Sequence, residues 1–264
     1  MAAGMISVAE ALEALFALVV PTEPEEVPLT AALGRQMIRP VRAARSQPPF
    51  PASAMDGYAV QGAALGARYR VIGEAAAGSR FDGAVGPGEA VRIFTGAPVP
   101  IGADRVVIQE DVTREGEGIE ITAAPEAAPH IRPMGADFAA GTELSPRRLA
   151  PGDIALLAAM NIPTVTVARK PVVALMPTGD ELVQPGEAPG PDQITASNIY
   201  GLHALLTAAG AAPRLLPIAR DNAASLEMAF GLAEGADLLV TIGGASVGDH
   251  DLVGPVGARL GMSR

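Results

Sequence analysis

The chain has 264 residues, a formal charge of −10, no cysteine and a single lysine, Lys170. Without cysteine it has no disulfides, thiolate metal sites or cysteine nucleophiles, and only 3 histidines disfavour a histidine-rich metal centre. The acidic balance disfavours nucleic acid as a partner, and 3% aromatic residues disfavour base stacking. No apolar run approaches the roughly 20 residues of a membrane span, and no signal-peptide pattern is present. We therefore expect a cytoplasmic protein with no membrane or nucleic-acid partner.

The first part of the chain combines short helices with strand-like runs. Ser7 and Glu10 form a capping-box pattern that predicts a helix from about Ser7 to Val20. A short helix is expected around Leu29–Leu33, ended by Gly34. The proline-rich stretch RSQPPFP (45–51) predicts a stiff, non-helical connection.

A β-rich block follows this proline-rich stretch, because short apolar runs alternate there with Gly and Pro turns. Strands are predicted near residues 69–74, 89–94, 105–109, 111–115 and 118–122. REGEG (114–118) is typical of a hairpin turn between the last two runs. A helix at 150–160 and an extended run at 162–169 are expected after this block.

From Lys170 onward, strands and helices alternate. PVVALM (171–176) is a continuous apolar run, as expected for a strand that is buried on both faces. The next predicted elements are a helix at 197–209 capped by Ser197, a strand near 214–218, a helix near 223–234 and a strand at 237–242. This βαβαβ order predicts a parallel sheet with right-handed crossovers.

Acidic or glycine-rich loops follow all three of these strands. Asp180 and Glu181 follow the first, Asp221 follows the second, and GGASVGDHD (243–251) follows the third. Parallel strands bring such loops to one edge of the sheet, where ligands bind in open α/β folds. Carboxylates gather around an anionic ligand only with a cation between them, so this arrangement predicts Mg²⁺. The structural alternative is that these residues only start helices and form tight turns.

The glycine-rich loop after the third strand has candidate ligand-binding groups of its own. Gly243 and Gly244 allow the backbone to approach a ligand closely, and successive N–H groups can cradle an anion. Ser246 adds a hydroxyl group, and Asp249 and Asp251 add carboxylates.

Two polar motifs of the β-rich block are also candidates. Asp56 of SAMDGYAV (53–60) could bind a metal or activate water, or it could simply belong to an Asp-Gly turn that opens a hairpin. Thr95 of TGAPVP (95–100) could bind an anion, or the motif could be a Pro-constrained connector. Asp137, in MGADFAAG (134–141), has no assignable role from its own pattern.

Five motifs together resemble one known family. SAMDGYAV, TGAPVP, MGADFAAG, PTGDEL (177–182) and GGASVG (243–248) occur in this order along essentially the whole chain. The chain is similar to the molybdopterin molybdenumtransferases of the MoeA and gephyrin E-domain family. GGASVG alone is a weak signal because other molybdopterin-binding and CinA-like proteins have similar turns. SAMDGYAV with TGAPVP is specific.

The resemblance implies a multi-domain α/β fold. Residues 5–44 and 138–169 would form an N-terminal α+β domain I, with an inserted β-rich domain II at 45–137. Residues 170–264 would form part of a parallel-sheet, MoaB/Mog-like molybdopterin-binding domain III. The family's C-terminal β-barrel domain and its basic PGKP segment are missing, and Ala136 stands where the family often has Glu.

The resemblance also implies a reaction: transfer of molybdate to adenylylated molybdopterin with release of AMP, assisted by Mg²⁺. The enzyme would be a homodimer with the site shared between subunits, supplied by a molybdopterin adenylyltransferase. The implied catalytic residues are Asp56, Thr95, Asp137 and Glu181. The implied substrate-binding residues are Asp180, Asp221, Gly243, Gly244, Ser246, Gly248 and Asp251. The implied metal ligands are Glu181, Asp221 and Asp251.

Two other functions remain open at the level of sequence. The chain could be a non-catalytic molybdopterin-binding or scaffolding module, an alternative favoured by the missing C-terminal parts. It could also be a CinA-like nucleotide hydrolase, which the N-terminal motifs disfavour.

Overall fold

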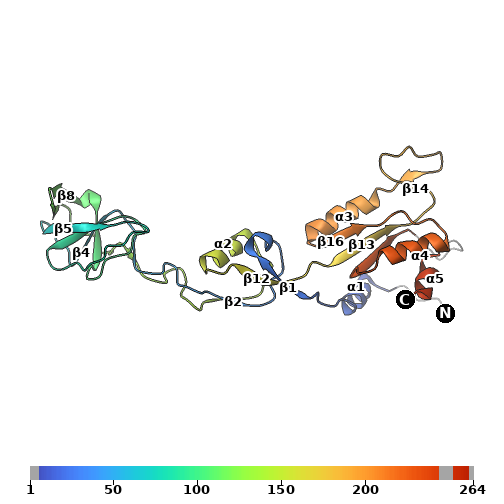
Figure 1. Cartoon of the computed structure of the whole chain (residues 1–264), viewed down its shortest axis with the longest axis horizontal. Coiled ribbons are helices and arrows are strands. Elements are labelled where there is room, and N and C mark those ends of the chain that lie inside the picture. Colours follow the sequence, from blue (N-terminus) through green and yellow to red (C-terminus); the bar gives the residue numbers. More distant parts are fainter. Residues whose placement is uncertain (1–5, 244–251, 262–264) are drawn as a thin grey trace. The chain divides into compact units, whose positions relative to one another are not determined.

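A computed structural model describes residues 6–243 and 252–261, which form two compact units. The first unit contains Gly34–Ile38 together with the segments that end at Val27 and begin at Thr166. The second unit contains Pro28–Leu33 and Arg39–Val165. Figure 1 shows the elements of each unit along the chain. This mixed α/β architecture confirms the predicted fold class.

A six-stranded sheet dominates the second unit, in the order β7-β4-β6-β5-β9-β8. Its strands are β4 (Gly57–Val60), β5 (Arg68–Ala75), β6 (Glu89–Ile93), β7 (Arg105–Ile108), β8 (Val112–Glu115) and β9 (Gly118–Ile121). All neighbours are antiparallel except β5 and β6. The five predicted strand runs and the hairpin between β8 and β9 are confirmed. Two short 3₁₀ turns lie within the described part of the chain, η1 (Leu29–Ala31) and η2 (Gln109–Asp111).

The segment after Asp56 corrects the turn interpretation. Gly57–Val60 is not one arm of a local hairpin, because β4 pairs with β6 and β7, which lie far along the chain. The whole strand is buried. Alternate residues of β4 pack into two different apolar clusters: Tyr58 and Val60 belong to one cluster, and Ala59 belongs to the other. Long-range burial therefore outweighs the local turn preference of Asp-Gly.

Short paired strands flank this sheet in the chain. Strand β3 (Ala52–Ser53) pairs with β10 (Ile131–Arg132), and β2 (Val41–Arg42) pairs with β11 (Glu143–Leu144), both antiparallel. The chain therefore enters the six-stranded sheet through β2 and β3 and returns from it through β10 and β11, which pair with them. This pairing is what an inserted block at 45–137 would require, and the division into domains I and II stays a prediction.

The remaining elements before the α/β domain are α1 (Val8–Ala17), β1 (Pro24–Pro28), α2 (Pro151–Ala159) and β12 (Thr164–Ala168). Strand β12 pairs with β1. Helix α1 has the predicted capping box, since Ser7 N donates to Glu10 Oε2 at 2.7 Å and Glu10 N donates to Ser7 Oγ at 3.2 Å. It ends at Ala17, three residues before the predicted end. The expected short helix is the 3₁₀ turn η1.

A three-stranded parallel sheet forms the core of the first unit, in the order β16-β13-β17. Its strands are β13 (Val172–Pro177), β16 (Ala212–Leu215) and β17 (Leu238–Ile242); its helices are α3 (Asn198–Ala209), α4 (Ala223–Leu232) and α5 (Val253–Arg259). A short parallel ladder joins β14 (Leu182–Val183) to β15 (Ile194–Thr195). The predicted βαβαβ unit is confirmed.

The central strand β13 packs on both faces, as its apolar run predicts. Val173 and Leu175 pack with Ile199 of α3 on one face. Ala174 and Met176 pack in a cluster with residues of α4 and α5 on the other face. In Figure 1, α3 and α4 lie on opposite sides of this sheet. The sheet is therefore doubly wound around β13.

Two details of this domain differ from prediction. Ser197 occupies the N-cap position of α3, but its backbone is already helical and its side chain makes no capping bond. The second strand begins at Ala212 and ends at Leu215, earlier than predicted. The last regular bond of the ladder runs from Leu216 N to the Leu175 carbonyl at 2.9 Å, and the next bond to β13, from Ala219 N to the Pro177 carbonyl, comes one residue late, so the regular pairing is lost after Leu216.

An ion-pair network joins β12 to the α/β domain within the first unit. Arg169 donates from Nη1 and Nη2 to the two Asp237 oxygens at 2.8 and 2.7 Å, and from Nε to Glu23 at 2.9 Å. Val172 N also donates to Asp237 at 2.7 Å. The Arg169 guanidinium, followed by the Val172 N–H, holds the pKa of the Asp237 carboxyl well below its usual range.

This network predicts a pH-dependent contribution to stability. A carboxyl whose pKa is lowered by folding stabilises the fold above its unfolded pKa of about 3.9, and the contribution is lost as pH falls. We expect Asp237→Asn to lower the melting temperature at pH 7, and the gap to the unmodified chain to shrink below about pH 4. Melting temperatures across this range measure it; a gap independent of pH would contradict the assignment.

Gly57 gives a second prediction about stability. A Cβ atom at this position would lie 2.0 Å from the Val107 carbonyl oxygen on the neighbouring strand. We expect Gly57→Ala to destabilise the chain by about 3 kcal/mol, since backbone cannot yield as a side chain can. Gly201→Ala in α3 is the control: nothing lies near its Cβ, so it should stabilise by about 0.5–1 kcal/mol. Denaturant unfolding compares the two variants, and equal effects would refute the packing argument.

Candidate functional site at the carboxyl edge of the parallel sheet

The three parallel strands end side by side, and hydrogen bonds join the residues that follow them. Thr178 N donates to the Ile242 carbonyl at 2.9 Å, which ties the end of β13 to the end of β17. On the other side, Gly179 N donates to the Ala219 carbonyl at 3.1 Å, and Ala219 forms a parallel bridge with Thr178. The loops after β13 and β16 and the start of the loop after β17 therefore meet at one edge, as predicted.

Gly243 is required by the protein's own backbone. Its φ of +103° is in the region that favours glycine, and a Cβ there would lie 2.6 Å from both the carbonyl and the hydroxyl oxygen of Thr178. The close approach to the Gly243 backbone, which was predicted for a ligand, is therefore made by Thr178 of the neighbouring loop. The predicted residues Gly244, Ser246, Gly248 and Asp251, together with Asp249, lie outside the described residues.

Asp180 and Asp221 are brought together, as predicted from their places after two strands. The amide nitrogen of Asp221 donates to Asp180 Oδ1 at 3.2 Å. Asn222 caps helix α4 by accepting from Ser225 N at 2.9 Å, which fixes the chain just beyond Asp221. Two loops far apart in sequence thus meet at the Asp180 carboxylate.

Glu181 lies beside them, over the backbone of Gly179. The φ of Gly179 is +145°, and a Cβ there would lie 2.3–2.7 Å from the Glu181 carboxyl group. Within the described ranges 6–243 and 252–261, no group of three or more His, Asp or Glu residues is arranged to hold a metal ion. The third predicted metal ligand, Asp251, lies outside those ranges.

Sequence reasoning did not identify Arg220, which lies at the centre of these loops. Its Nη1 donates to the carbonyl oxygens of Gly179 at 3.3 Å, Asp180 at 3.0 Å and Leu182 at 3.1 Å. The signal that could have found it is its position in IARD (218–221), where a cation follows a buried strand at the ligand-binding edge of the sheet.

Asp56 and Thr95, in the second unit, contact each other directly. Asp56 Oδ1 accepts a hydrogen bond from Thr95 N and another from Thr95 Oγ1, both at 2.7 Å. The Thr95 N–H and then its hydroxyl lower the pKa of Asp56, with a smaller contribution from Arg92. The SAMDGYAV and TGAPVP motifs therefore form one polar cluster that favours the ionised form of the Asp56 carboxyl.

Arg92 supports this cluster from the sheet. Its guanidinium lies 5.1 Å from the centre of the Tyr58 ring and 4.6 Å from that of Phe94. Its Nη1 donates to the Gly57 carbonyl at 3.0 Å, and its Nη2 donates to Gln109 Oε1 at 2.6 Å. The start of β4, directly after Asp56, is thus tied to β6 and to Gln109 through Arg92.

Asp137 is paired with a cation. Arg132 Nη2 donates to Asp137 Oδ1 at 2.6 Å, and the Asp137 amide donates to the Gln47 carbonyl at 2.9 Å. Asp137 is therefore held by β10 through its carboxylate and by the proline-rich connection through its main chain.

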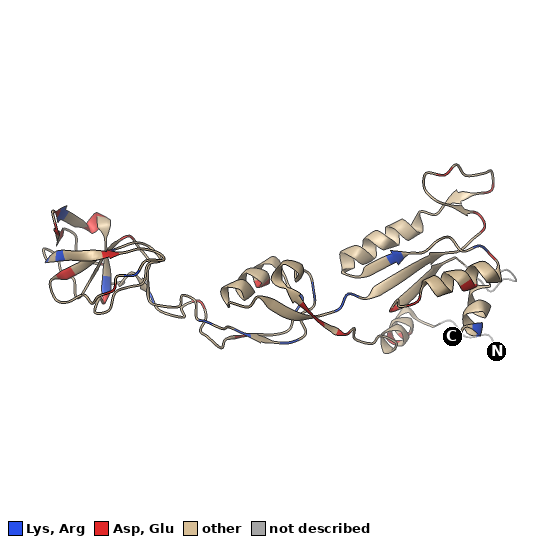
Figure 2. Cartoon of the chain, in the orientation of Figure 1, with Lys and Arg blue, Asp and Glu red and all other residues tan. Residues whose placement is uncertain are grey.

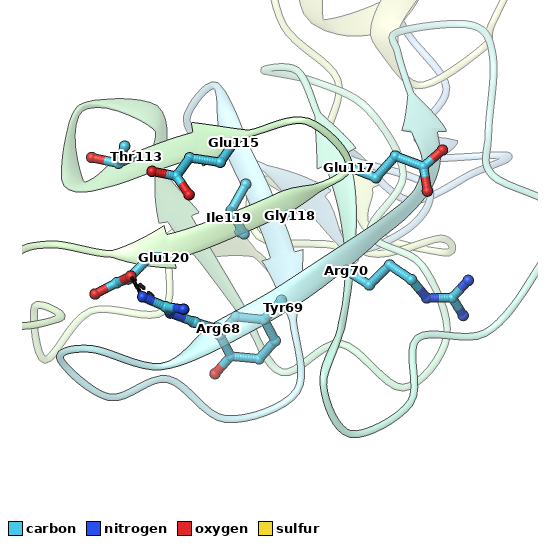
Figure 3. Close-up of a pocket in the computed structure, with 9 residues that line it drawn as sticks. All are labelled: Arg68, Tyr69, Arg70, Thr113, Glu115, Glu117, Gly118, Ile119 and Glu120. Carbon is cyan, nitrogen blue, oxygen red and sulfur yellow. Dashed lines mark hydrogen bonds and ion pairs between the residues drawn. The ribbon is translucent and has the colours of Figure 1, made fainter.

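A separate hollow of about 400 Å³ lies on the β5, β9 and β8 strands of the second unit. Arg68 and Glu120 pair across β5 and β9 in this hollow, with Nη2 and Oε2 2.6 Å apart, as Figure 3 shows. None of the predicted site residues lines it. Its charges of both signs give it no preference for an anionic ligand.

Charged residues of both signs are distributed along both units in Figure 2. No helix among the described residues is both long and apolar enough to cross a bilayer.

A β-rich unit joined to a doubly wound parallel sheet defines a multi-domain α/β protein, and the carboxylates and the positive-φ glycine at the carboxyl edge of that sheet mark this edge as the candidate ligand site. Comparison with family models agrees with this class. Residues 6–161 match the MoeA N-terminal region (domain I and II), and residues 174–264 match a probable molybdopterin binding domain.

Relatives with known names lead to the same family. The chain is 40% identical to a molybdopterin molybdenumtransferase from Nostoc sp., over 90% of this chain and 57% of that protein. It is 35% identical to the one from Haemophilus influenzae, over 92% and 61%. A crystal structure of the molybdopterin biosynthesis MoeA protein from Pyrococcus horikosii matches with a TM-score of 0.83 and 34% identity, over 98% and 67%.

The chain belongs to the MoeA family. It spans about three fifths of the length of the curated relatives it matches.

The Asp56–Thr95 contact predicts how one substitution changes a pKa. Thr95→Val removes the hydroxyl donor but keeps the main-chain N–H, which is the larger cause of the lowered pKa. We expect the Asp56 pKa to rise and yet stay below its usual value, while Thr95→Ser leaves it unchanged. Carboxyl ¹³C NMR titration measures this; an Asp56 pKa that does not respond to Thr95→Val would contradict the assigned hydrogen bonds.

Proposed function

We propose that this chain acts in molybdenum cofactor biosynthesis as a molybdopterin molybdenumtransferase, transferring molybdate to adenylylated molybdopterin with release of AMP. The observation that carries the proposal is the convergence of Asp180, Glu181 and Asp221 at the carboxyl edge of the parallel sheet, in a domain that matches a probable molybdopterin binding domain. Membership of the MoeA family supports the reaction.

The residues present suit such a reaction. Cleavage of a phosphoanhydride depends on positioning and on stabilisation of developing charge more than on a protein nucleophile. The sulfur atoms that receive molybdenum belong to the pterin, so the absence of cysteine is no obstacle. Asp56 and Asp137 are charged groups held by short hydrogen bonds, as positioning residues need to be.

Mg²⁺ is part of this proposal, and its donors would be oxygen atoms. Glu181 and Asp221 supply carboxylates at the sheet edge, with Asp251 as the third ligand expected from the family pattern. Hard divalent cations prefer such ligands. When bound, Mg²⁺ would neutralise negative charge between the carboxylates and the phosphate of the substrate. Asp180 would bind substrate beside it, with Gly244, Ser246 and Gly248 holding the phosphate end of the pterin.

The site would be completed in a homodimer. Asp56, Thr95 and Asp137 would form one wall, and the α/β domain of the other subunit would form the second. Domains I, II and III would divide the chain at 5–44 with 138–169, 45–137 and 170–264. An adenylyltransferase would supply the substrate, and the cytoplasm would be the compartment.

One assay tests the proposal. The chain is incubated with adenylylated molybdopterin, molybdate and Mg²⁺, and AMP and pterin-bound molybdenum are measured. Release of AMP with incorporation of molybdenum is the expected result. Binding without release would favour a non-catalytic molybdopterin-binding module, and nucleotide hydrolysis without the pterin would favour a CinA-like activity.

Substitutions within the proposed site sharpen this test. Asp56→Ala and Glu181→Ala should each reduce turnover by on the order of 10²-fold or more, as loss of a charge-positioning group does, while the melting temperature stays close to that of the unmodified chain. The paired surface residue Glu227, on α4, provides the control Glu227→Ala, which should keep full turnover. Undiminished AMP release in either site variant would remove that residue from the site.

A further inference from the structure

Three main-chain carbonyl groups of the loop that carries Glu181 share one side-chain donor nitrogen. Arg220 Nη1 donates to the carbonyl oxygens of Gly179, Asp180 and Leu182. The remaining carbonyl of this loop, that of Glu181 itself, accepts from Ile194 N at 2.8 Å. All four consecutive carbonyl groups therefore have protein partners, and three of the four depend on Arg220.

Arg220 is itself fixed at its backbone. Its amide donates to Ser225 Oγ at 2.9 Å in the first turn of α4, and the preceding residue, Ala219, is bridged to Thr178 beside β13. The guanidinium thus extends from an anchored position into the turn of the neighbouring loop. Gly179, with φ +145°, allows the chain to turn around it.

We propose that Arg220 is a positioning residue that sets the conformation of residues 179–182 and thereby the place of the Glu181 and Asp180 carboxylates. The proposal rests on the proposed function, because it assigns Glu181 and Asp180 to the ligand site. Arg220 acts through these residues. The carbonyls of Asp180 and Leu182 flank Glu181 in the chain, so their common donor fixes the backbone on both sides of the Glu181 side chain.

The donor geometry distinguishes this role from a general requirement for arginine. One nitrogen contacts all three carbonyl oxygens, and since Nη1 carries two hydrogens, at least one hydrogen is shared between two of them. A lysine ammonium group carries three N–H donors on one nitrogen and can satisfy three carbonyls. Lysine should therefore replace Arg220 in part, whereas methionine should not.

The experiment compares Arg220→Lys and Arg220→Met in the full chain. Arg214→Met is the matched control, because Arg214 lies on β16 of the same sheet and donates to one main-chain carbonyl, that of Glu234, at 2.9 Å. Hydrogen exchange is followed at the Ile194 and Asp221 amides, which donate to Glu181 and Asp180 respectively. The kcat and KM for AMP release are measured in parallel.

In Arg220→Met we expect at least tenfold faster exchange at both amides and kcat lowered by on the order of 10²-fold, the scale of a misplaced reacting group. KM should change less than threefold. Arg220→Lys should recover most of the protection and of kcat, and Arg214→Met should behave as the unmodified chain.

Unchanged exchange and kcat in Arg220→Met, or a lysine variant as impaired as the methionine variant, would overturn the proposal. If Arg220→Met does not fold, Arg220→Gln, which retains one donor group, takes its place with the same criteria. Absence of turnover in the unmodified chain would count against the proposed function alone. The exchange comparison would then decide the role of Arg220.

Discussion

The arrangement of the candidate site depends on the burial of β13 between two parallel strands. Its residues alternate between two apolar clusters, one with α3 and one with α4 and α5, so neither its register nor its direction can change without exposing one of them. This constraint brings the ends of all three strands to one edge. Thr178 then connects to Ile242 on one side and to Ala219 on the other. The polar loops that follow the three strands therefore lie together at this edge.

Polar groups at this edge are satisfied by cross-loop bonds. Arg220 donates hydrogen bonds to three carbonyl groups of the loop after β13, and Asp180 accepts a hydrogen bond from the backbone of the loop after β16. The same logic holds Asp56 in the other unit, where a Thr95 N–H and hydroxyl fix one carboxylate oxygen. In both places a carboxylate is oriented by bonds from a segment distant in sequence, as a preorganised binding site requires.

Sequence patterns predicted the parts of the fold that depend on local periodicity and on burial. The apolar run of β13, the capping box at Ser7 and the hairpin between β8 and β9 followed from residue types alone, and so did the meeting of Asp180 with Asp221. Strand β4 was missed because its burial comes from partners 30 or more residues away. Arg220 was missed because its three partners are main-chain carbonyls, which leave no trace in residue identity. The Asp56–Thr95 hydrogen bonds could not be predicted either, because the two residues are distant in sequence and meet only in the folded chain.

We expect the ligand to bind at the carboxyl edge of the parallel sheet. Hydrogen exchange of every amide, with and without molybdopterin, tests it most directly. Exchange should become slower in the ligand-bound chain at residues 178–182 and 219–222, and should not change in the hollow on β5, β8 and β9. Slowing confined to that hollow, with none at the sheet edge, would contradict it.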